Sequence, residues 1–377
     1  MSTYNLLIDG TPADDDLVKA IATLEVEENV ELPGAIQLKL PVSPTDSGDL
    51  TYVADSRFRP FANIAVVATP DSGSPECIFD GYVLSHKIHL EKGTTSSSIE
   101  VWGQDASWLM NLEDKTREWV DVTDADVASS VFGDYGISPA PDNSDDDSPS
   151  HTEDGHSLMQ RATDFQFLRM LARRNGKLCR VACADQPGGR IGYFAKPNFE
   201  GDPAVTLNLN DPVSSNVKAL DIEWDVTRPS AAVARQALFT DSDPDGVSAD
   251  TTDSGLAPLD QQSLADFAGK AITVMVTAPV DNGGELSLRA QSVLREAGFF
   301  VRCEGESDVA LLGAVLRAGT LVAIDGIGSF HSGNYYVWSV HHSITADSHK
   351  MKFVLVRNAI GPAPQSGGGL LGGIGSP

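Results

Sequence analysis

The chain has 377 residues, of which 41% are hydrophobic and 21% are charged, a composition that suits a globular protein with two or three hydrophobic cores. Its 53 acidic and 27 basic residues give a formal net charge of −26, which argues against a surface that neutralises nucleic-acid phosphates. No apolar run approaches the roughly 18 to 20 residues of a membrane span, and no signal peptide precedes the first strand. The sequence therefore predicts a soluble protein, made in the cytoplasm and without membrane insertion.

Acidic residues gather in loop-like runs at 14–16, 142–147 and 241–253. None of these runs has the alternating carboxylates closed by Glu that an EF-hand needs. Cys179 and Cys183 lie too far apart along a strand to form a disulfide, and no second Cys/His pair suggests zinc. We therefore expect no metal ion and no cofactor. The acidity is interpreted either as the lining of a passage for anionic cargo or as a mark of a saline habitat.

The first 112 residues predict an antiparallel β-domain. Apolar and polar residues alternate along 22–27 and 36–40, which indicates a long hairpin with its turn near Gly34. Further strands are expected at 4–8, 64–67, 79–85 and 99–103. Since closure of a sheet removes its exposed edges, we predict a small tube-like barrel for residues 1–112.

Residues 113–214 and 240–315 predict one α+β insertion domain. The clearest helix covers 164–175, because Thr163 and Gln166 have the spacing of a capping box and Gly176 suits the left-handed closing position. Other helices are expected at 124–132, 264–268 and 286–297, and strands at 178–182, 190–194, 205–209 and 272–277.

Residues 215–239 and 316–360 predict a second tube-like barrel, which the insertion splits. Its strands are expected at 220–226, 231–239, 321–324, 335–341 and 351–356. Met351, Phe353 and Leu355 should share a buried face, because side chains alternate along a strand. The fold class is therefore mainly β with α+β insertions, with two similar small antiparallel β-barrels per chain.

The two β-regions look like copies of one unit. Tyr82-Val83 is followed by Ser85 in the first, and Tyr336-Val337 is followed by Ser339 in the second, with similar spacing to the next strand. A plainer interpretation is that a Tyr-Val pair is a common way to open a strand.

The histidines suggest no catalytic or metal-binding set. His341 and His342 are adjacent in a strand and face opposite ways, although His331 and His349 are near them in sequence. The HExxH, GxSxG and P-loop patterns do not occur. We therefore predict a protein that is not an enzyme, with no catalytic, cofactor-binding or metal-binding residues.

The order of these elements resembles the baseplate hub proteins of contractile tails. The resemblance covers residues 22–358 and rests on the segments 103–105, 162–172, 316–319, 332–337 and 353–358. That group includes the late-control protein D of contractile phages, the N-terminal half of the VgrG spikes of type VI secretion, and the hubs of extracellular contractile injection systems. VgrG chains continue into an OB-fold and a β-helical needle, whereas this chain ends in a Gly-rich tail, residues 361–377. The spike is therefore expected to be a separate protein.

The resemblance implies a homotrimer in which six barrels form a pseudo-six-fold ring. Such a hub adapts the six-fold inner tube to the three-fold spike, contacts other baseplate proteins and forms part of the channel for cargo or DNA. The particle would be a phage tail, a secretion apparatus or a free injection device. The expected contacts of the flexible tail with the spike or the lumen are Gly361, Pro362, Leu370, Leu371 and Ile374.

Two other functions stay open at this point. One is a tail-associated hydrolase, such as a peptidoglycan-degrading enzyme. The other is a trimeric β-rich protein that binds a receptor, as an adhesin does.

Overall fold

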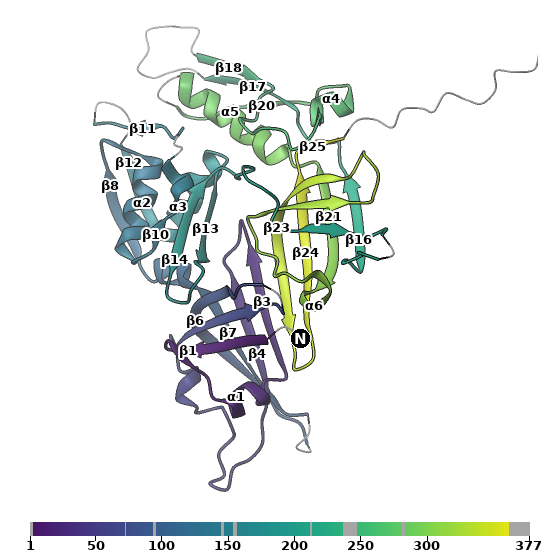
Figure 1. Cartoon of the computed structure of the whole chain (residues 1–377). Helices are drawn as coiled ribbons and strands as arrows, with labels where there is room; N and C mark the ends of the chain where they lie inside the picture. The colour runs from purple at the N-terminus through teal and green to yellow at the C-terminus, as the bar shows by residue number, and fades with distance from the viewer. Residues whose placement is uncertain are drawn as a thin grey trace, which may run out of the picture.

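A computed structural model of the chain shows four lobes, two of them built from one long sheet (Figure 1). The structure describes residues 3–71, 73–92, 96–144, 147–153, 157–211, 213–236, 247–280 and 283–361. Within these residues the long sheet has 13 strands, in an order that runs from β16 (Ala219–Trp224) through β23 (Gly333–Ile344) and β3 (Thr23–Asn29) to β2 (Thr11–Pro12). The mainly β fold class is thus confirmed.

The first lobe, here called module 1, is nearly all strand. It contains β1 (Thr3–Ile8), β2 (Thr11–Pro12), β3 (Thr23–Asn29), β4 (Ala35–Pro41), β5 (Asn63–Thr69), β6 (Glu76–His89), β7 (Ser98–Asp105) and α1 (Asp15–Ala20). Alternating residues such as Leu24, Val26, Ile36 and Leu38 are buried on one face, and Leu17 of α1 joins their core. The strands predicted in this region are confirmed.

The second lobe is an α/β unit with its own core. It contains β8 (Asp114–Trp119), β9 (Val122–Thr123), α2 (Asp124–Asp134), β10 (Ser138–Pro139), β11 (Ser150–His151), β12 (Leu158–Thr163), α3 (Asp164–Arg174), β13 (Leu178–Cys183) and β14 (Arg190–Ala195). Thr163 accepts a hydrogen bond from the backbone of Gln166, and Gly176 has φ +60° after the helix end, as the sequence predicts. Phe132, Phe167 and Phe194 are fully buried in this core.

The third lobe, module 2, holds the other half of the long sheet. It contains β15 (Thr206–Asn208), β16 (Ala219–Trp224), β21 (Val301–Asp308), α6 (Val309–Leu312), β22 (Leu321–Asp325), β23 (Gly333–Ile344), β24 (His349–Arg357) and β25 (Ala359–Ile360). Met351, Phe353 and Leu355 lie together in its core, as expected.

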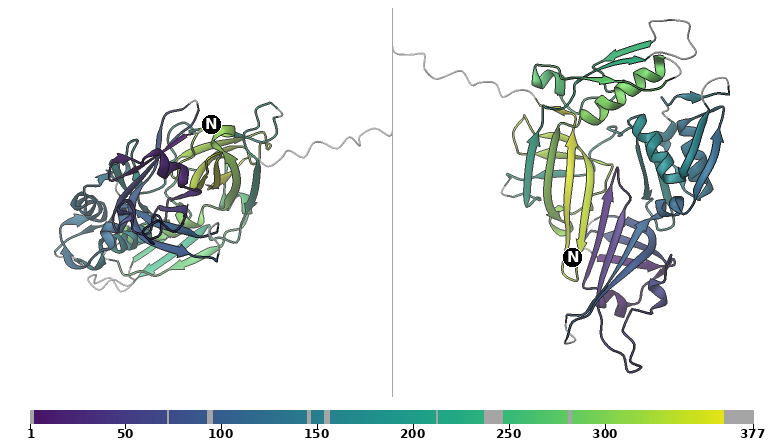
Figure 2. Two further views of the ribbon diagram at one scale, coloured as in Figure 1. Left: turned by 90° about the horizontal axis from the view of Figure 1, so that it is seen from below. Right: turned by 180° about the vertical axis from the view of Figure 1, so that it is seen from behind.

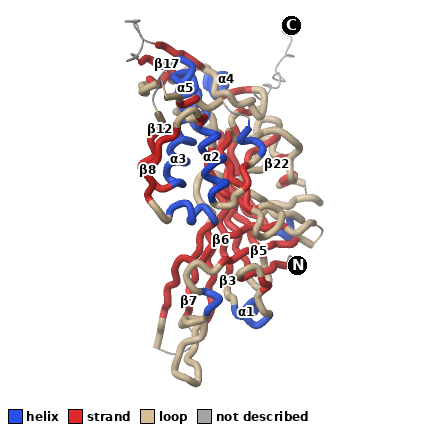
Figure 3. Tube along the Cα trace, turned by 90° about the vertical axis from the view of Figure 1, so that its left-hand side faces the viewer, coloured by secondary structure: helices blue, strands red, loops and turns tan. Residues whose placement is uncertain are grey.

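The fourth lobe packs a helix on a small sheet. It contains β17 (Ala231–Gln236), β18 (Val247–Thr251), β19 (Gln262–Ser263), α4 (Leu264–Ala268), β20 (Thr273–Val276) and α5 (Gly283–Ala297). Leu286, Ala290 and Leu294 of α5 form a stripe against Ala232 and Ala234. Figure 3 shows that the longer helices α2, α3 and α5 lie in the two inserted lobes.

Two strand assignments from the sequence are wrong. β17 was expected in the second barrel, but it pairs with β18 and β20, because Ala232 and Ala234 are needed to cover α5. β21 lies in the region assigned to the insertion, but it pairs with β16 and β24 and buries Val301 and Cys303 in the core of module 2.

Modules 1 and 2 repeat the same strand order. It is β3-β4-β7-β6-β5-β1 in module 1 and β16-β21-β24-β23-β22-β15 in module 2. The sixth strands differ, since β1 is antiparallel to β5 while β15 is parallel to β22.

The repeat extends to single residues. A register shift falls between Val83 and Ser85 in β6, and between Val337 and Ser339 in β23. Before each long strand a residue with positive φ donates its N–H to the matching valine carbonyl. Phe61 bonds Val83 at 2.9 Å, and Gly319 bonds Val337 at 2.8 Å. These matches support two copies of one unit over a chance similarity.

No helix in the described part of the chain is both long and apolar enough to cross a bilayer.

The close packing of module 1 predicts a strong effect at Gly81. A Cβ there would collide with the backbone carbonyl of Gln104 and lie 2.6 Å from the ring of Phe79. We expect Gly81→Ala to lower the free energy of unfolding by about 1 to 3 kcal/mol. Gly133→Ala is the matched control, because Gly133 is exposed in α2 with no atom near its Cβ position, and it should stabilise by about 0.5 to 1 kcal/mol. Urea titration followed by circular dichroism tests both; equal effects would contradict the packing argument.

Candidate assembly interface

The two modules are joined by a strand pair. The second half of β23 leaves β22 after the bulge and runs antiparallel to β3. In this register Ser339 lies opposite Asn29 and Ile344 lies opposite Leu24. The junction therefore makes one continuous sheet from two modules, seen where the purple and yellow regions meet in Figure 2.

A buried ionic network lies at this junction. Arg317, from module 2, donates through Nε to both carboxylate oxygens of Glu28 at 2.9 and 3.0 Å, and through Nη1 to Glu76 at 3.1 Å. His342 Nε2 lies 3.3 Å from Glu28, and its Nδ1 lies 3.0 Å from His349 Nε2. His342 is 0% exposed and Glu28 only 8%, so the buried carboxylate of Glu28 depends on the guanidinium of Arg317 and on the hydrogen bond with His342.

The network shifts the acidities of its members. Burial raises the pKa of Glu28, but Arg317 and His342 outweigh it and hold that pKa below its ordinary value. Burial, helped by His342, lowers the pKa of His349 to about 3. Glu28 is thus ionised and His349 neutral at physiological pH, which fits a static clamp between the modules.

β6 has an open edge where β23 has a partner. β5 covers β6 only as far as Tyr82, and no strand in the described residues pairs with that edge from Ser85 to His89. These residues are mostly exposed, and Leu90 just beyond them is 59% exposed. An unpaired strand edge with exposed apolar side chains is a template for another strand.

β16 has the complementary open edge. It is the last strand of the long sheet and pairs with β21 alone in the part of the chain that the structure describes. Trp224 is 49% exposed, although its ring lies edge-on to Phe267 at 5.3 Å. By position in the repeat, β16 matches β3 and the open part of β6 matches the part of β23 that pairs with β3.

The sheet face turned away from the two cores has mixed charge. Its acidic members are Glu25, Glu27, Glu100, Asp221, Glu223, Glu304 and Glu306, and its basic members are Lys39, Lys87, Arg302, Lys350 and Lys352. Interleaved charges of both signs give this face a weaker field than the net charge of the chain suggests.

The family model described as the Alg8 N-terminal domain matches residues 1–346. The chain belongs to this family. No curated protein matches the chain.

Solved tail proteins share the fold of the chain. The 43 kDa tail protein of prophage MuSo2 from Shewanella oneidensis matches 96% of the chain and 100% of its own, at 17% identity and a TM-score of 0.65. A tail protein from Neisseria meningitidis MC58 matches 95% and 97%, at 12% identity and 0.65. The Escherichia coli c3393 protein matches 95% and 79%, at 13% identity and 0.56; it is described as a type VI secretion component similar to the phage T4 tail proteins gp27 and gp5. The likeness confirms, for the fold, the resemblance to tail-hub proteins.

The expected tail contacts are only partly visible. Gly361 is buried and donates its N–H to the carbonyl of Phe330 at 3.1 Å, while its own carbonyl accepts from Gln262 at 2.5 Å. It therefore anchors the end of module 2. Pro362, Leu370, Leu371 and Ile374 lie outside the described residues.

The junction network and the open strand edges were not predicted from the sequence. Arg317 and Glu28 are 289 residues apart, so no local pattern links them. The edges did leave a signal, because Leu24-Glu25-Val26-Glu27 and Leu220-Asp221-Ile222-Glu223 have the same pattern at matching positions. His341 and His342 do face opposite ways, with only His342 inside. No group of three metal-ligand side chains occurs among the described residues.

The lowered pKa of His349 predicts a pH-dependent stability. The unfolded chain takes up a proton on this histidine near its ordinary pKa of about 6.5, whereas the folded chain does so only near 3. The contribution of His349 to the free energy of unfolding is therefore full well above pH 6.5 and decreases as the pH drops through that value. Between about pH 7.5 and 5.5 the free energy of unfolding should decrease by about 1.4 kcal/mol.

Thermal unfolding at these two pH values should show a smaller loss for His349→Gln than for the natural chain. His341→Gln, on the exposed face of the neighbouring strand, should leave the loss unchanged. An undiminished loss in His349→Gln would show that other groups cause it.

Proposed function

We propose that the protein is the structural hub of a contractile tail or injection-system baseplate. Three chains form a ring in which six modules act as six small barrels, and this ring adapts a six-fold inner tube to a three-fold spike. The observation that carries the proposal is the repeated strand order with one open edge of each kind. The shared fold of phage and secretion tail proteins supports it.

The junction inside the chain supplies a template for contact between chains. If β6 of one chain pairs with β16 of the next as β23 pairs with β3, the register is fixed by the repeat. It would place Ser85 opposite Asp225, His86 opposite Trp224, Lys87 opposite Glu223, Ile88 opposite Ile222, His89 opposite Asp221, and Leu90 opposite Leu220. Because the two edges differ, the contact is head-to-tail, and a rotation of one third of a turn per chain would close it into a ring of three.

The side chains fit this register. Lys87 would meet the opposite charge of Glu223 on the exposed face, and both residues are exposed in the single chain. Ile88 would meet Ile222 on the core side, where both are half-buried in the single chain. Pairing inside each module fixes the side on which each isoleucine lies, so a shift of one residue between chains would set core-side residues opposite solvent-side residues, which the pleat of a sheet does not allow.

The proposed ring also assigns a place to each of the four lobes. Modules 1 and 2 would form the ring, with β21 in module 2, and the two inserted lobes would stand on one side of it. The mixed-charge sheet face would line the channel. Because charges of both signs alternate there, a passing cargo or DNA would meet no large area of one sign that could bind it tightly. The tube hexamer would dock on the six modules, and the spike and other baseplate proteins on the remaining surfaces.

A charge swap tests the ring contact. Lys87→Glu or Glu223→Lys should each raise the concentration needed for assembly about tenfold, because like charges then face each other at three contacts. The double variant should restore assembly. Light scattering after gel filtration distinguishes one chain of 40.0 kDa from about 120 kDa for three, with and without the spike protein.

Cysteine pairs test the register. Lys87→Cys with Glu223→Cys should give covalent trimers under oxidation, whereas Lys87→Cys with Asp221→Cys, shifted by two residues, should give few. A chain that stays monomeric with its tube and spike proteins present would refute the hub, and efficient linkage only in the shifted pair would refute the register.

The tail offers a separate test. Deletion after Gly361 should weaken association with the spike protein and leave thermal unfolding unchanged, because Gly361 keeps its anchoring bonds. Replacing Leu370, Leu371 and Ile374 by Ser keeps the length of the tail and should weaken association similarly if the apolar residues make the contact. Unchanged pull-down of the spike by both variants would contradict a role for the tail.

A further inference from the structure

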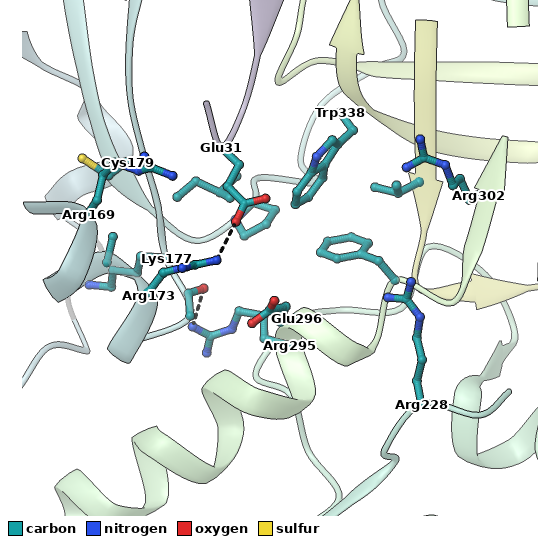
Figure 4. A pocket seen from close by; sticks show the side chains of 16 residues that line it. Glu31, Arg169, Arg173, Lys177, Cys179, Arg228, Arg295, Glu296, Arg302 and Trp338 are labelled. Atoms are coloured by element: carbon teal, nitrogen blue, oxygen red, sulfur yellow. Dashed lines mark hydrogen bonds and ion pairs between the residues drawn. The ribbon is translucent and has the colours of Figure 1, made fainter. Parts of the chain in front are cut away.

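A cavity of about 250 Å³ lies where both inserted lobes meet the two modules (Figure 4). α3 and β13 supply one wall, the end of α5 supplies the floor, and β21, β23 and β24 of module 2 supply the opposite wall. The turn between β3 and β4 reaches it through Glu31. Segments far apart in the chain thus converge on one hollow.

The cavity is basic in an otherwise acidic protein. Six cations line it but only two carboxylates do, Glu31 and Glu296. The cations are Arg169, Arg173, Lys177, Arg228, Arg295 and Arg302. Five of these cations lie within 4 Å of a carboxylate: Arg173 of Glu31, Lys177 and Arg295 of Asp147, Arg228 of Asp225, and Arg302 of Glu304. With Asp147, Asp225 and Glu304 added to the two lining carboxylates, a small excess of positive charge remains, which in a chain of net charge −26 still favours an anion at this place.

The deepest cation is incompletely compensated. Arg295 is 2% exposed and donates to the carbonyls of Asn175 at 2.8 Å and Ser254 at 3.0 Å. Among the described residues its buried Nη2 has no hydrogen-bond partner, and the carboxylate of Asp147 lies 3.8 Å away. Burial lowers the pKa of Arg295. An anionic group in the cavity would stabilise this charge.

Aromatic rings lie between the two groups of arginines. The ring centroids of Phe299 and Trp338 are 5.7 Å apart, with the rings packed edge to face. Figure 4 shows Trp338 between Arg173 on one side and Arg302 on the other. Trp338 is the residue that the register shift of β23 leaves out of the pairing with β24, so the bulge turns its ring towards the cavity. The site therefore offers an apolar surface as well as charge.

We propose that this cavity binds an acidic peptide segment of another protein, with an aromatic or aliphatic side chain against Trp338 and carboxylates on the flanking arginines. The arginines stand on opposite sides of the hollow and do not converge on one point, which suits carboxylates spread along a chain better than a single phosphate. The volume is below the roughly 300 Å³ at which small-molecule pockets begin, and it suits one or two side chains.

Two labelled peptides of equal length test the proposal by fluorescence anisotropy on the full chain. One is acidic with a central phenylalanine (Glu-Asp-Glu-Phe-Glu-Asp), and in the other every acidic residue is replaced by lysine. The acidic peptide should bind, with affinity that falls as salt is raised, and the lysine peptide should not. Failure of the acidic peptide to bind at low salt would overturn the proposal.

Paired charge reversals locate the site. Arg173→Glu with Arg302→Glu, both partly exposed, should weaken binding at least tenfold, and Trp338→Leu should weaken it less and leave the salt dependence intact. Lys19→Glu with Lys270→Glu makes the same change in net charge at exposed positions outside the cavity and should have little effect. Equal loss in both double variants, or full displacement of the peptide by millimolar phosphate, would refute a peptide site. Unchanged light-scattering mass in each variant separates this result from failure of the ring.

Discussion

An unpaired strand edge is the constraint on which the rest of this structure depends. Module 1 ends its sheet at β3, and that edge is satisfied only because β23 changes partner after its bulge. The change of partner also leaves β22 beside the first half of β23, so one strand holds module 2 together and joins it to module 1. In the described part of the chain, β6 and β16 each keep an unpaired edge, and these two edges match the two that are joined at the junction between the modules.

Equivalent positions at the inner and outer junctions carry different chemistry. Inside the chain, Glu28, Arg317 and His342 form a buried network that costs desolvation and depends on every member. At the matching places of the open edges stand Trp224, Arg59 and Ile88, which are apolar or exposed. A junction within one chain is permanent, so its charged groups can stay buried and paired. A strand edge that is exposed to water before assembly instead needs side chains that are stable in contact with water.

Local signals made most of the elements predictable. Alternation along 22–27 and 36–40, the capping residues Thr163 and Gln166, and Gly176 each specify their structure within a few residues. Pairing between distant strands was less accessible. β21 has Gly305 and four charged side chains, a composition that resembles a loop. β17 begins with four apolar residues, and its partner depends on where α5 packs.

The cavity and the junction were invisible in the sequence for the same reason. The cavity brings together residues from all four lobes and the junction brings together residues from both modules, and single arginines at such spacing look like ordinary surface charge. The repeated unit was detectable because its copies keep Tyr-Val and Ser at a bulge, where geometry limits the choice of residue.

The distance between paired strands also sets an order of events during synthesis. β3 and β4 are neighbours in the chain and can form a hairpin early, but β16 ends at Trp224 and waits for β21 at Val301, and β3 waits for β23 at Gly333. A nascent chain would therefore carry module 1 with a bare β3 edge while most of module 2 is still unmade. Glu25 and Glu27 on that edge strand would then act as gatekeepers against premature association between ribosome-bound chains.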